Sequence, residues 1–252
     1  MYFVMTDRNG LISLVPKGGT WAEVGVYKGD FSQIVIDTCK PSRYYLIDNW
    51  KFDVEEHNPL RQTTENFSNF SGRVHWEHYG DNANAHQEEN YQNVLKRFSE
   101  VPAVSVIRSR SIEGIQGLPD HHLDVIYIDA NHQYEYALQD LMQTRNKMKP
   151  GGIILMDDFY EGPGGVEQNE GVMAAVNTFV KRNDYTYLAM CCTSFGNVAL
   201  TDDPSSPYVQ EFLNNLKDSE FQFLGVSDVL VPNLRHKLYR KSNGEYRYVA
   251  ML

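Results

Sequence analysis

Acidic residues stand at the ends of four apolar runs, where the strands of a parallel sheet would end. The runs are TWAEV, YYLID, DVIYID and GGIILMDD, and their acids are Glu23, Asp48, Asp129, Asp157 and Asp158. In an open α/β sheet, ligands bind in the crevice beyond the carboxyl ends of the strands. Carboxylates collected at that edge can accept hydrogen bonds from ribose hydroxyls, hold a cationic cofactor and coordinate a hard metal ion. The pattern therefore predicts a site for a cofactor and a metal.

The segment EVGVYKG (residues 23–29) has the composition of a ligand-binding turn between a strand and a helix. Its glycines, Gly25 and Gly29, let the backbone approach a ligand closely. A dinucleotide site would carry G-x-G-x-x-G, but the paired glycine is missing here and Glu23 would repel a pyrophosphate. A carboxylate at this position suits an ammonium group, and Asp48 stands where an acid accepts from ribose hydroxyls. These features favour S-adenosylmethionine over NAD.

Three carboxylates are expected to meet at the ends of two neighbouring strands. Asp129 ends one predicted strand, and Asp157 and Asp158 end the next. Unpaired carboxylates repel one another unless some take up protons or a cation lies between them. Oxygen ligands select Mg²⁺ or Mn²⁺ over zinc. From the residues alone, capping of a helix or turn by Asp157 or Asp158 explains the pair as well as metal binding does. His132 follows Asp129 by three residues and is the candidate general base, with local packing as its alternative.

The hydrophobic pattern supplies the elements that position these residues. Segments 20–26, 43–48, 104–108, 124–129 and 152–157 are predicted to be buried strands. Apolar residues recur at helical spacing over 91–98, 134–148, 172–180 and 209–216. Pro150-Gly151-Gly152 is expected to end the second of these helices, and TYLAM and NVALT are expected to pair as an antiparallel edge. Strands that alternate with helices indicate a doubly wound parallel sheet.

A family resemblance covers about residues 20–182. The stretches that carry it are AEVGVYKGDFS, YYLIDNW, SVIRSRSIEG, DVIYIDANHQYEYALQDL, KPGGIILMDDF and GVMAAVNTFV. In this order they resemble class I S-adenosylmethionine-dependent methyltransferases. More narrowly, they resemble the metal-dependent O-methyltransferases of the macrocin and novobiocin tailoring type, and more distantly catechol O-methyltransferases. The resemblance implies a Rossmann-like, seven-stranded, mostly parallel sheet with helices on both faces.

The resemblance also implies roles for individual residues. Glu23 would hold the methionine ammonium group, Asp48 the ribose, and Ser111 would lie near the adenine. The turn around Gly25, Tyr27 and Gly29, with Ser32 behind it, would line the cofactor. Asp129, Asp157 and Asp158 would coordinate the divalent ion, and Asp129 and His132 would serve catalysis. Asn131 stands where some relatives carry an acid, which leaves the identity of the base open.

The length, the net charge and the cysteine count of the chain indicate its domain number, its partners and its location. The 252 residues fit one domain, with a core of about 18–202, an insertion at 49–88 that would form a lid or acceptor wall, and a C-terminal extension at 203–252. A net charge of −10 argues against a nucleic-acid partner. No apolar stretch approaches the roughly 20 residues that span a membrane. Three cysteines and no signal segment indicate reduced thiols and a cytoplasmic location.

The expected reaction is methylation of a sugar hydroxyl in a glycan or a glycosylated natural product. A small-molecule or glycan acceptor would be the partner, and a homo-oligomer is left open. Aromatic residues that could stack on sugar rings are Trp50, Phe52, Trp76, Tyr79, Tyr246 and Tyr248. Four alternatives stay open, namely a catechol or polyketide phenol as the acceptor, a metal-dependent hydrolase, an NAD-dependent oxidoreductase and a non-catalytic glycan-binding module.

Overall fold

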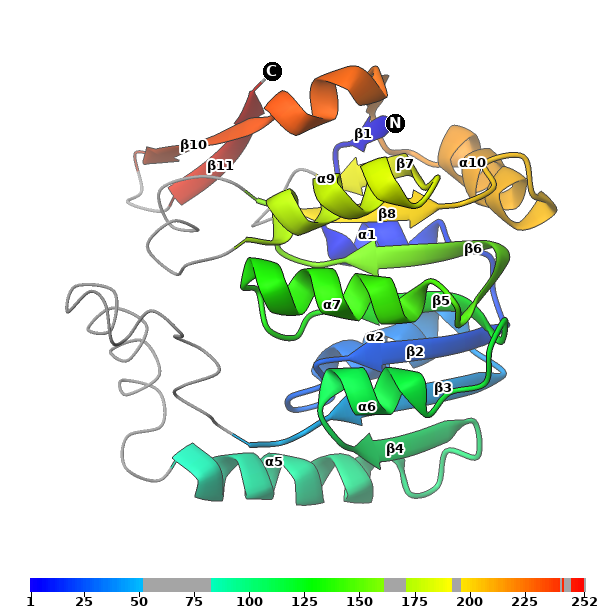
Figure 1. Cartoon of the computed structure of the whole chain (residues 1–252), viewed down its shortest axis with the longest axis vertical. Coiled ribbons are helices and arrows are strands. Elements are labelled where there is room, and N and C mark those ends of the chain that lie inside the picture. The colour runs from blue at the N-terminus through cyan, green and yellow to red at the C-terminus, as the bar shows by residue number, and fades with distance from the viewer. Residues whose placement is uncertain (52–82, 161–170, 192–195, 241, 243–245, 252) are drawn as a thin grey trace.

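The computed structural model describes residues 1–51, 83–160, 171–191, 196–240, 242 and 246–251 (Figure 1). A nine-stranded sheet crosses the molecule in the order β4-β3-β2-β5-β6-β8-β7-β1-β9. Its strands are β1 Tyr2–Val4, β2 Thr20–Val24, β3 Arg43–Asp48, β4 Val104–Arg108, β5 Leu123–Ile128, β6 Met148–Met156, β7 Thr186–Cys191, β8 Asn197–Thr201 and β9 Phe223–Gly225. Two further strands, β10 Arg235–Arg240 and β11 Tyr246–Met251, form a separate antiparallel pair.

Helices cover both faces of the sheet, as the sequence predicts (Figure 1). One face carries α6 Ser111–Gln116, α7 Tyr134–Thr144 and α9 Val172–Arg182. The other carries α1 Arg8–Ser13, α2 Asp30–Cys39, α5 Ala83–Phe98 and α10 Pro207–Asp218. A short 3₁₀ helix, η2 Asp228–Asn233, follows β9. The predicted doubly wound α/β class is therefore confirmed.

The central strands are apolar on both sides because both faces of the sheet are covered. In β2, Ala22 and Val24 pack into the core on the side of α6 and α7, whereas Trp21 packs on the side of α2. The strands β4, β3, β2, β5 and β6 run parallel to their neighbours. Their carboxyl ends consequently lie at one edge of the sheet.

The strand count differs from the expected seven. Segments TYLAM and NVALT do pair as antiparallel β7 and β8, but they do not form the edge. Strand β8 lies between β6 and β7, and β1 pairs with β7 in parallel, with Tyr2 opposite Ala189. Strand β9 then pairs with β1 and forms the outer edge. Both added strands are only three residues long, too short for periodicity to indicate them.

The segment Pro150-Gly151-Gly152 does not end a helix, contrary to the prediction. Helix α7 ends at Thr144, and Met148, which was expected on the helix, begins β6. The pairing of β5 with β6 shifts register within this segment, and Gly151 has a φ of +73°. A glycine with positive φ inside a strand is typical of a bulge. The glycines thus admit an irregularity of the strand.

Other expectations can be placed on the described residues. Helix α5 begins at Ala83, inside the predicted insertion, and residues 52–82 of that insertion lie outside the described residues. The pairing of β10 with β11 agrees with a C-terminal hairpin, whose turn residues 243–245 are also outside them. Cys39 is a buried free thiol, and Cys191 is buried as well. In the described part of the chain, no helix has the length and apolar character that crossing a membrane requires.

Candidate functional site

A cavity of about 610 Å³ opens beyond the carboxyl ends of β2, β3 and β5. Its volume falls within the range of about 300–1,000 Å³ that is usual for small-molecule sites. Predicted site residues that line it are Glu23, Gly25, Tyr27, Asp48, Ser111, Asp129 and His132. The structure thus brings these seven residues to one cavity. The other predicted site residues, Gly29, Ser32, Asp157 and Asp158, do not line it. Ser32 is fully buried in α2, and Gly29 is the N-cap of that helix.

Gly25 allows the turn after β2 to lie against the end of β5. Its φ is +90°, and a Cβ atom at this position would lie 1.8 Å from the carbonyl oxygen of Asp129. The amide of Asp129 donates to the carbonyl of Val24 at 2.8 Å. Only glycine accepts both this conformation and this approach. The turn and the first carboxylate of the predicted metal site are thus held against each other by backbone contacts.

Asp48 fixes the same turn from the other side. Its Oδ2 atom accepts hydrogen bonds from the amides of Val26 and Tyr27, each at 2.8 Å, and its Oδ1 atom accepts from the amide of Trp50 at 2.7 Å. A carboxylate offers about four acceptor positions. Three of these positions accept hydrogen bonds from backbone amides, so one acceptor position of Asp48 is left for a ligand hydroxyl.

Glu23 is a buried carboxyl group at the wall of the cavity, with 1% of its surface exposed. The Tyr44 hydroxyl donates a hydrogen bond to it. Burial raises the pKa of Glu23 to about 8, although the hydrogen bond from Tyr44 lowers it. At neutral pH the side chain is therefore largely protonated in the protein as described. A cationic ligand group beside it would favour the ionised form.

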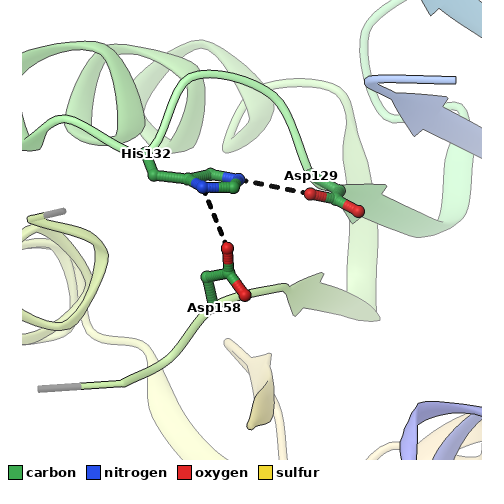
Figure 2. A group of neighbouring side chains, drawn as sticks. All are labelled: Asp129, His132 and Asp158. Atoms are coloured by element: carbon green, nitrogen blue, oxygen red, sulfur yellow. Dashed lines mark hydrogen bonds and ion pairs between the residues drawn. The ribbon is translucent and has the colours of Figure 1, made fainter. Parts of the chain in front are cut away.

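Asp129, His132 and Asp158 form a compact cluster next to this turn (Figure 2). His132 lies between the two acids, with Nε2 3.2 Å from Asp129 Oδ1 and Nδ1 2.9 Å from Asp158 Oδ2. One potential ligand atom from each of the three side chains lies within 4.8 Å of the others. Strand β5 and the loop before α7 supply the first two residues, and the loop after β6 supplies the third.

The two carboxylates dominate the electrostatics of His132. Burial lowers its pKa, but the charges of Asp158 and Asp129 and their hydrogen bonds raise it, so that it lies well above the ordinary value. Both ring nitrogens donate in this arrangement, which describes an imidazolium ion. His132 would therefore act as a base only after one of these carboxylates has been neutralised or drawn away.

Asp157 is placed differently from the two carboxylates that hold His132. It is 8% exposed, its Oδ1 atom accepts from the side-chain amide of Asn197, and its Oδ2 atom lies 3.3 Å from Arg8 Nη1. Burial and the nearby charge of Asp129 raise the pKa of Asp157 to about 7. The structure thus brings Asp129 and Asp158 together around His132, while Asp157 faces Arg8 and Asn197.

Several residues of the site carried no signal in the sequence. Arg8 belongs to a short N-terminal helix without a motif, and Tyr44 and Asn197 lie within apolar strand segments. Conversely, Trp50 is not available for stacking on a sugar, because it is 1% exposed and its ring packs 4.9 Å from that of Tyr91. Of the other aromatic candidates, the side chains of residues 52, 76, 79, 246 and 248 lie outside the described part of the chain.

The donor set fits a hard divalent cation. Asp129 and Asp158 supply carboxylate oxygens, and Asp157 adds a further acid beside them. His132 can supply a ring nitrogen only after it loses a proton. Oxygen-rich sites of this kind prefer Mg²⁺, Mn²⁺ or Ca²⁺. Cation binding here would require the carboxylates to exchange their contacts with His132 or Arg8 for contacts with the ion.

Comparisons with solved structures relate the fold to known proteins at very low sequence identity. A protein from Corynebacterium glutamicum is 8% identical, with 79% of this chain and 80% of that chain covered and a TM-score of 0.51. A spermidine synthase in complex with the transition-state analogue AdoDATO is 11% identical, with 92% and 72% covered and a TM-score of 0.50. These likenesses concern the fold alone.

Spermidine synthase from Thermotoga maritima is similar as well, at 10% identity and a TM-score of 0.49. The comparison covers 88% of this chain, which spans 65% of that protein's length. No curated protein sequence matches the chain.

A family profile, in contrast, matches the sequence directly. The family is described as "Methyltransferase domain", and the match runs from residue 22 to residue 159. These bounds enclose β2 through β6, the turn at Gly25, and the cluster of Asp129, His132 and Asp158. Because the match covers more than half of the 252 residues, the chain belongs to this methyltransferase family.

Proposed function

We propose that the protein is an S-adenosylmethionine- and divalent-metal-dependent O-methyltransferase whose acceptor is a sugar hydroxyl of a glycan or a glycosylated natural product. The observation that carries this proposal is that the glycine turn and the carboxylate cluster lie next to each other. The turn at Gly25 lines the same cavity as Asp129 and His132 of the cluster, and the backbone of Asp129 is packed on the turn, while Asp158 contacts His132. A methyl donor and a metal-bound hydroxyl would therefore be neighbours.

The residues around the turn support the cofactor assignment. Glu23 would bind the ammonium group in its ionised form, and the remaining acceptor position of Asp48 would take a ribose hydroxyl. Ser111 lines the cavity at the start of α6 and would lie at the adenine end. The bound cofactor supplies a methyl group on a sulfonium centre, which is an electrophile that needs an oxygen nucleophile in line with it.

The high pKa of an aliphatic hydroxyl supports a role for a metal ion in its methylation. A phenol loses its proton near pH 10, whereas the pKa of water, a guide to an alcohol, is about 15.7. The gap of about 6 pKa units corresponds to roughly 8 kcal/mol. A divalent ion held by Asp129 and Asp158 would stabilise the developing alkoxide and orient the acceptor. The sugar acceptor is proposed because the stretches quoted above resemble the macrocin and novobiocin tailoring enzymes.

His132 is the proposed carrier of the acceptor proton. Its two ring nitrogens face Asp129 and Asp158, so engagement of those carboxylates by a cation would remove the contacts that raise its pKa. The freed ring nitrogen could then accept the proton as the carbon–oxygen bond forms and the carbon–sulfur bond breaks. His132 lines the cavity and is therefore within reach of an acceptor bound there.

A substrate panel with a radiolabelled methyl donor tests this proposal. Chelator-treated protein is incubated with glycosides or with catechols and phenols, and then again after addition of Mg²⁺ or Mn²⁺. We expect methylation of glycosides that returns only with the metal. Asp158→Asn is expected to abolish turnover, while Asp218→Asn, an exposed acid on α10, serves as the matched control. Turnover of phenols alone contradicts the sugar assignment, and full activity after chelation contradicts the metal.

Calorimetry with S-adenosylhomocysteine separates the proposal from hydrolysis by the same carboxylates. A methyltransferase is expected to bind this product, and Glu23→Gln is expected to weaken the binding. A chain that binds no adenosyl compound but hydrolyses an ester in the presence of metal would favour the hydrolase.

A further inference from the structure

Arg8 brings a fixed positive charge into the carboxylate cluster from outside the matched family region. It is the first residue of α1, which precedes β2 in the chain. Its Nη1 atom lies 3.3 Å from Asp157 Oδ2 and 3.6 Å from Asp129 Oδ2. The guanidinium carbon lies 4.8 Å from the centre of the Phe31 ring, within range of a cation–π interaction. Arg8 also lines the cavity, and 41% of its side chain is exposed.

These contacts place Arg8 between two of the acids that would attract a metal ion. A guanidinium group stays protonated under all conditions relevant to proteins. The carboxylates of Asp157 and Asp129 and the neighbouring Tyr127 hydroxyl hold its pKa above the ordinary value, although burial lowers it. The positive charge next to Asp129 is therefore permanent. A divalent cation that binds Asp129 must either share this carboxylate with Arg8 or displace Arg8 from it.

We propose that Arg8 is a built-in competitor for the divalent cation and sets the affinity of the site. This inference rests on the metal-dependent function proposed above. The competition has two parts. The guanidinium group occupies carboxylate oxygens that the ion would use, and it repels the ion once bound, because both are positive. Removal of the charge should consequently strengthen cation binding, although it removes two ion pairs from the protein.

A purely structural role leads to the opposite expectation. If Arg8 served only to brace α1 against the sheet, its loss would leave Asp157 without its cationic partner and loosen the cluster. A disordered cluster binds a cation more weakly. The direction of the change in affinity therefore distinguishes competition from bracing.

Binding of Mn²⁺ to the whole chain tests the inference without reference to catalysis. Free Mn²⁺ is measured by electron paramagnetic resonance during titration of the wild type, Arg8→Gln, Arg8→Met and Arg8→Lys. Met keeps apolar packing on Phe31 without a charge, so the two neutral variants check each other if one folds poorly. Arg97→Gln is the matched control. Arg97 is exposed, its Nη1 atom lies 2.6 Å from Asp30 Oδ1, and this ion pair is not part of the cluster.

We expect the neutral variants to bind Mn²⁺ at least about tenfold more tightly than the wild type, which corresponds to about 1.4 kcal/mol. Arg8→Lys keeps a positive charge beside the carboxylates and should therefore bind Mn²⁺ more weakly than the neutral variants, while Arg97→Gln should stay within about threefold of the wild type. Neutral variants that fold and bind Mn²⁺ no more tightly than the wild type overturn the role of Arg8 alone. Failure of both the wild type and the neutral variants to bind Mn²⁺ overturns the metal-dependent function as well, so the two failures are distinguishable.

Discussion

Asp140 allows a quantitative prediction about stability, because it is an acid buried within α7 away from the cavity. It is 1% exposed and lies beside Ser111. Burial raises the pKa of Asp140 to about 7, and the neighbouring Ser111 hydroxyl offsets only part of this rise. In the unfolded chain the pKa returns to about 3.9.

The sign of the effect follows from these two pKa values. Because the folded-state pKa is the higher one, the unfolded state loses its proton first as the pH rises. The contribution of the protonated group to stability is complete below about pH 4 and is lost as the pH rises through about 7. About three pKa units at 1.36 kcal/mol each give a loss of roughly 4 kcal/mol at pH 8 and above.

Replacement by asparagine removes the ionisation and nearly keeps the shape. We expect Asp140→Asn to be more stable than the wild type by roughly 4 kcal/mol at pH 8 and by roughly 1.5 kcal/mol at pH 5. Denaturant unfolding at a series of pH values measures this difference. Glu135→Gln, on the exposed face of the same helix, is the matched control and should not change the pH dependence. A difference between Asp140→Asn and the wild type that does not vary with pH would refute the reasoning.

Three further predictions concern the site. Glu23→Gln is expected to weaken S-adenosylhomocysteine binding, measured by calorimetry, by about ten- to a hundredfold, because one charged hydrogen bond is lost. An unchanged affinity would contradict the proposed contact between Glu23 and the ammonium group. Gly25→Ala is expected to destabilise the protein by at least about 2 kcal/mol in denaturant unfolding, because the added Cβ would lie 1.8 Å from the Asp129 carbonyl oxygen; a fully stable variant would contradict the tight turn. His132→Gln is expected to lower the methylation rate at least about a hundredfold and to change its pH profile; a wild-type rate and profile would assign the proton to another group.

The central part of the fold was predictable because its signals are local. Strands β2, β3 and β5 are apolar runs that end within one residue of Glu23, Asp48 and Asp129, and burial on both faces makes such runs continuous. Since parallel strands end at one edge, the acids could be placed together without knowledge of the helices. The match of the family to residues 22–159 covers the same region.

The parts that were not predictable depend on contacts between distant segments. Strand β1 is a three-residue segment that exists because Tyr2 pairs with Ala189, far along the chain. The pairing of Arg8 with Asp157 is equally distant, and nothing in the sequence around Arg8 distinguishes it from a surface arginine. Pro150-Gly151-Gly152 is a local signal with two meanings, since the same residues end helices and admit bulges. Only the register of β5 with β6 separates the two.

The backbone at the sheet edge links the donor side of the site to the cation side. The amide of Gly25 donates to the Ile47 carbonyl at 2.9 Å, and the amide of Asp129 donates to the Val24 carbonyl at 2.8 Å. The turn after β2 is therefore tied to both neighbouring strands, and the backbone of Asp129 is held against it. Arg8, by contrast, comes from α1, outside the matched region. Changes in α1 can therefore alter the charge around the proposed cation site while the methyl-donor turn stays in place.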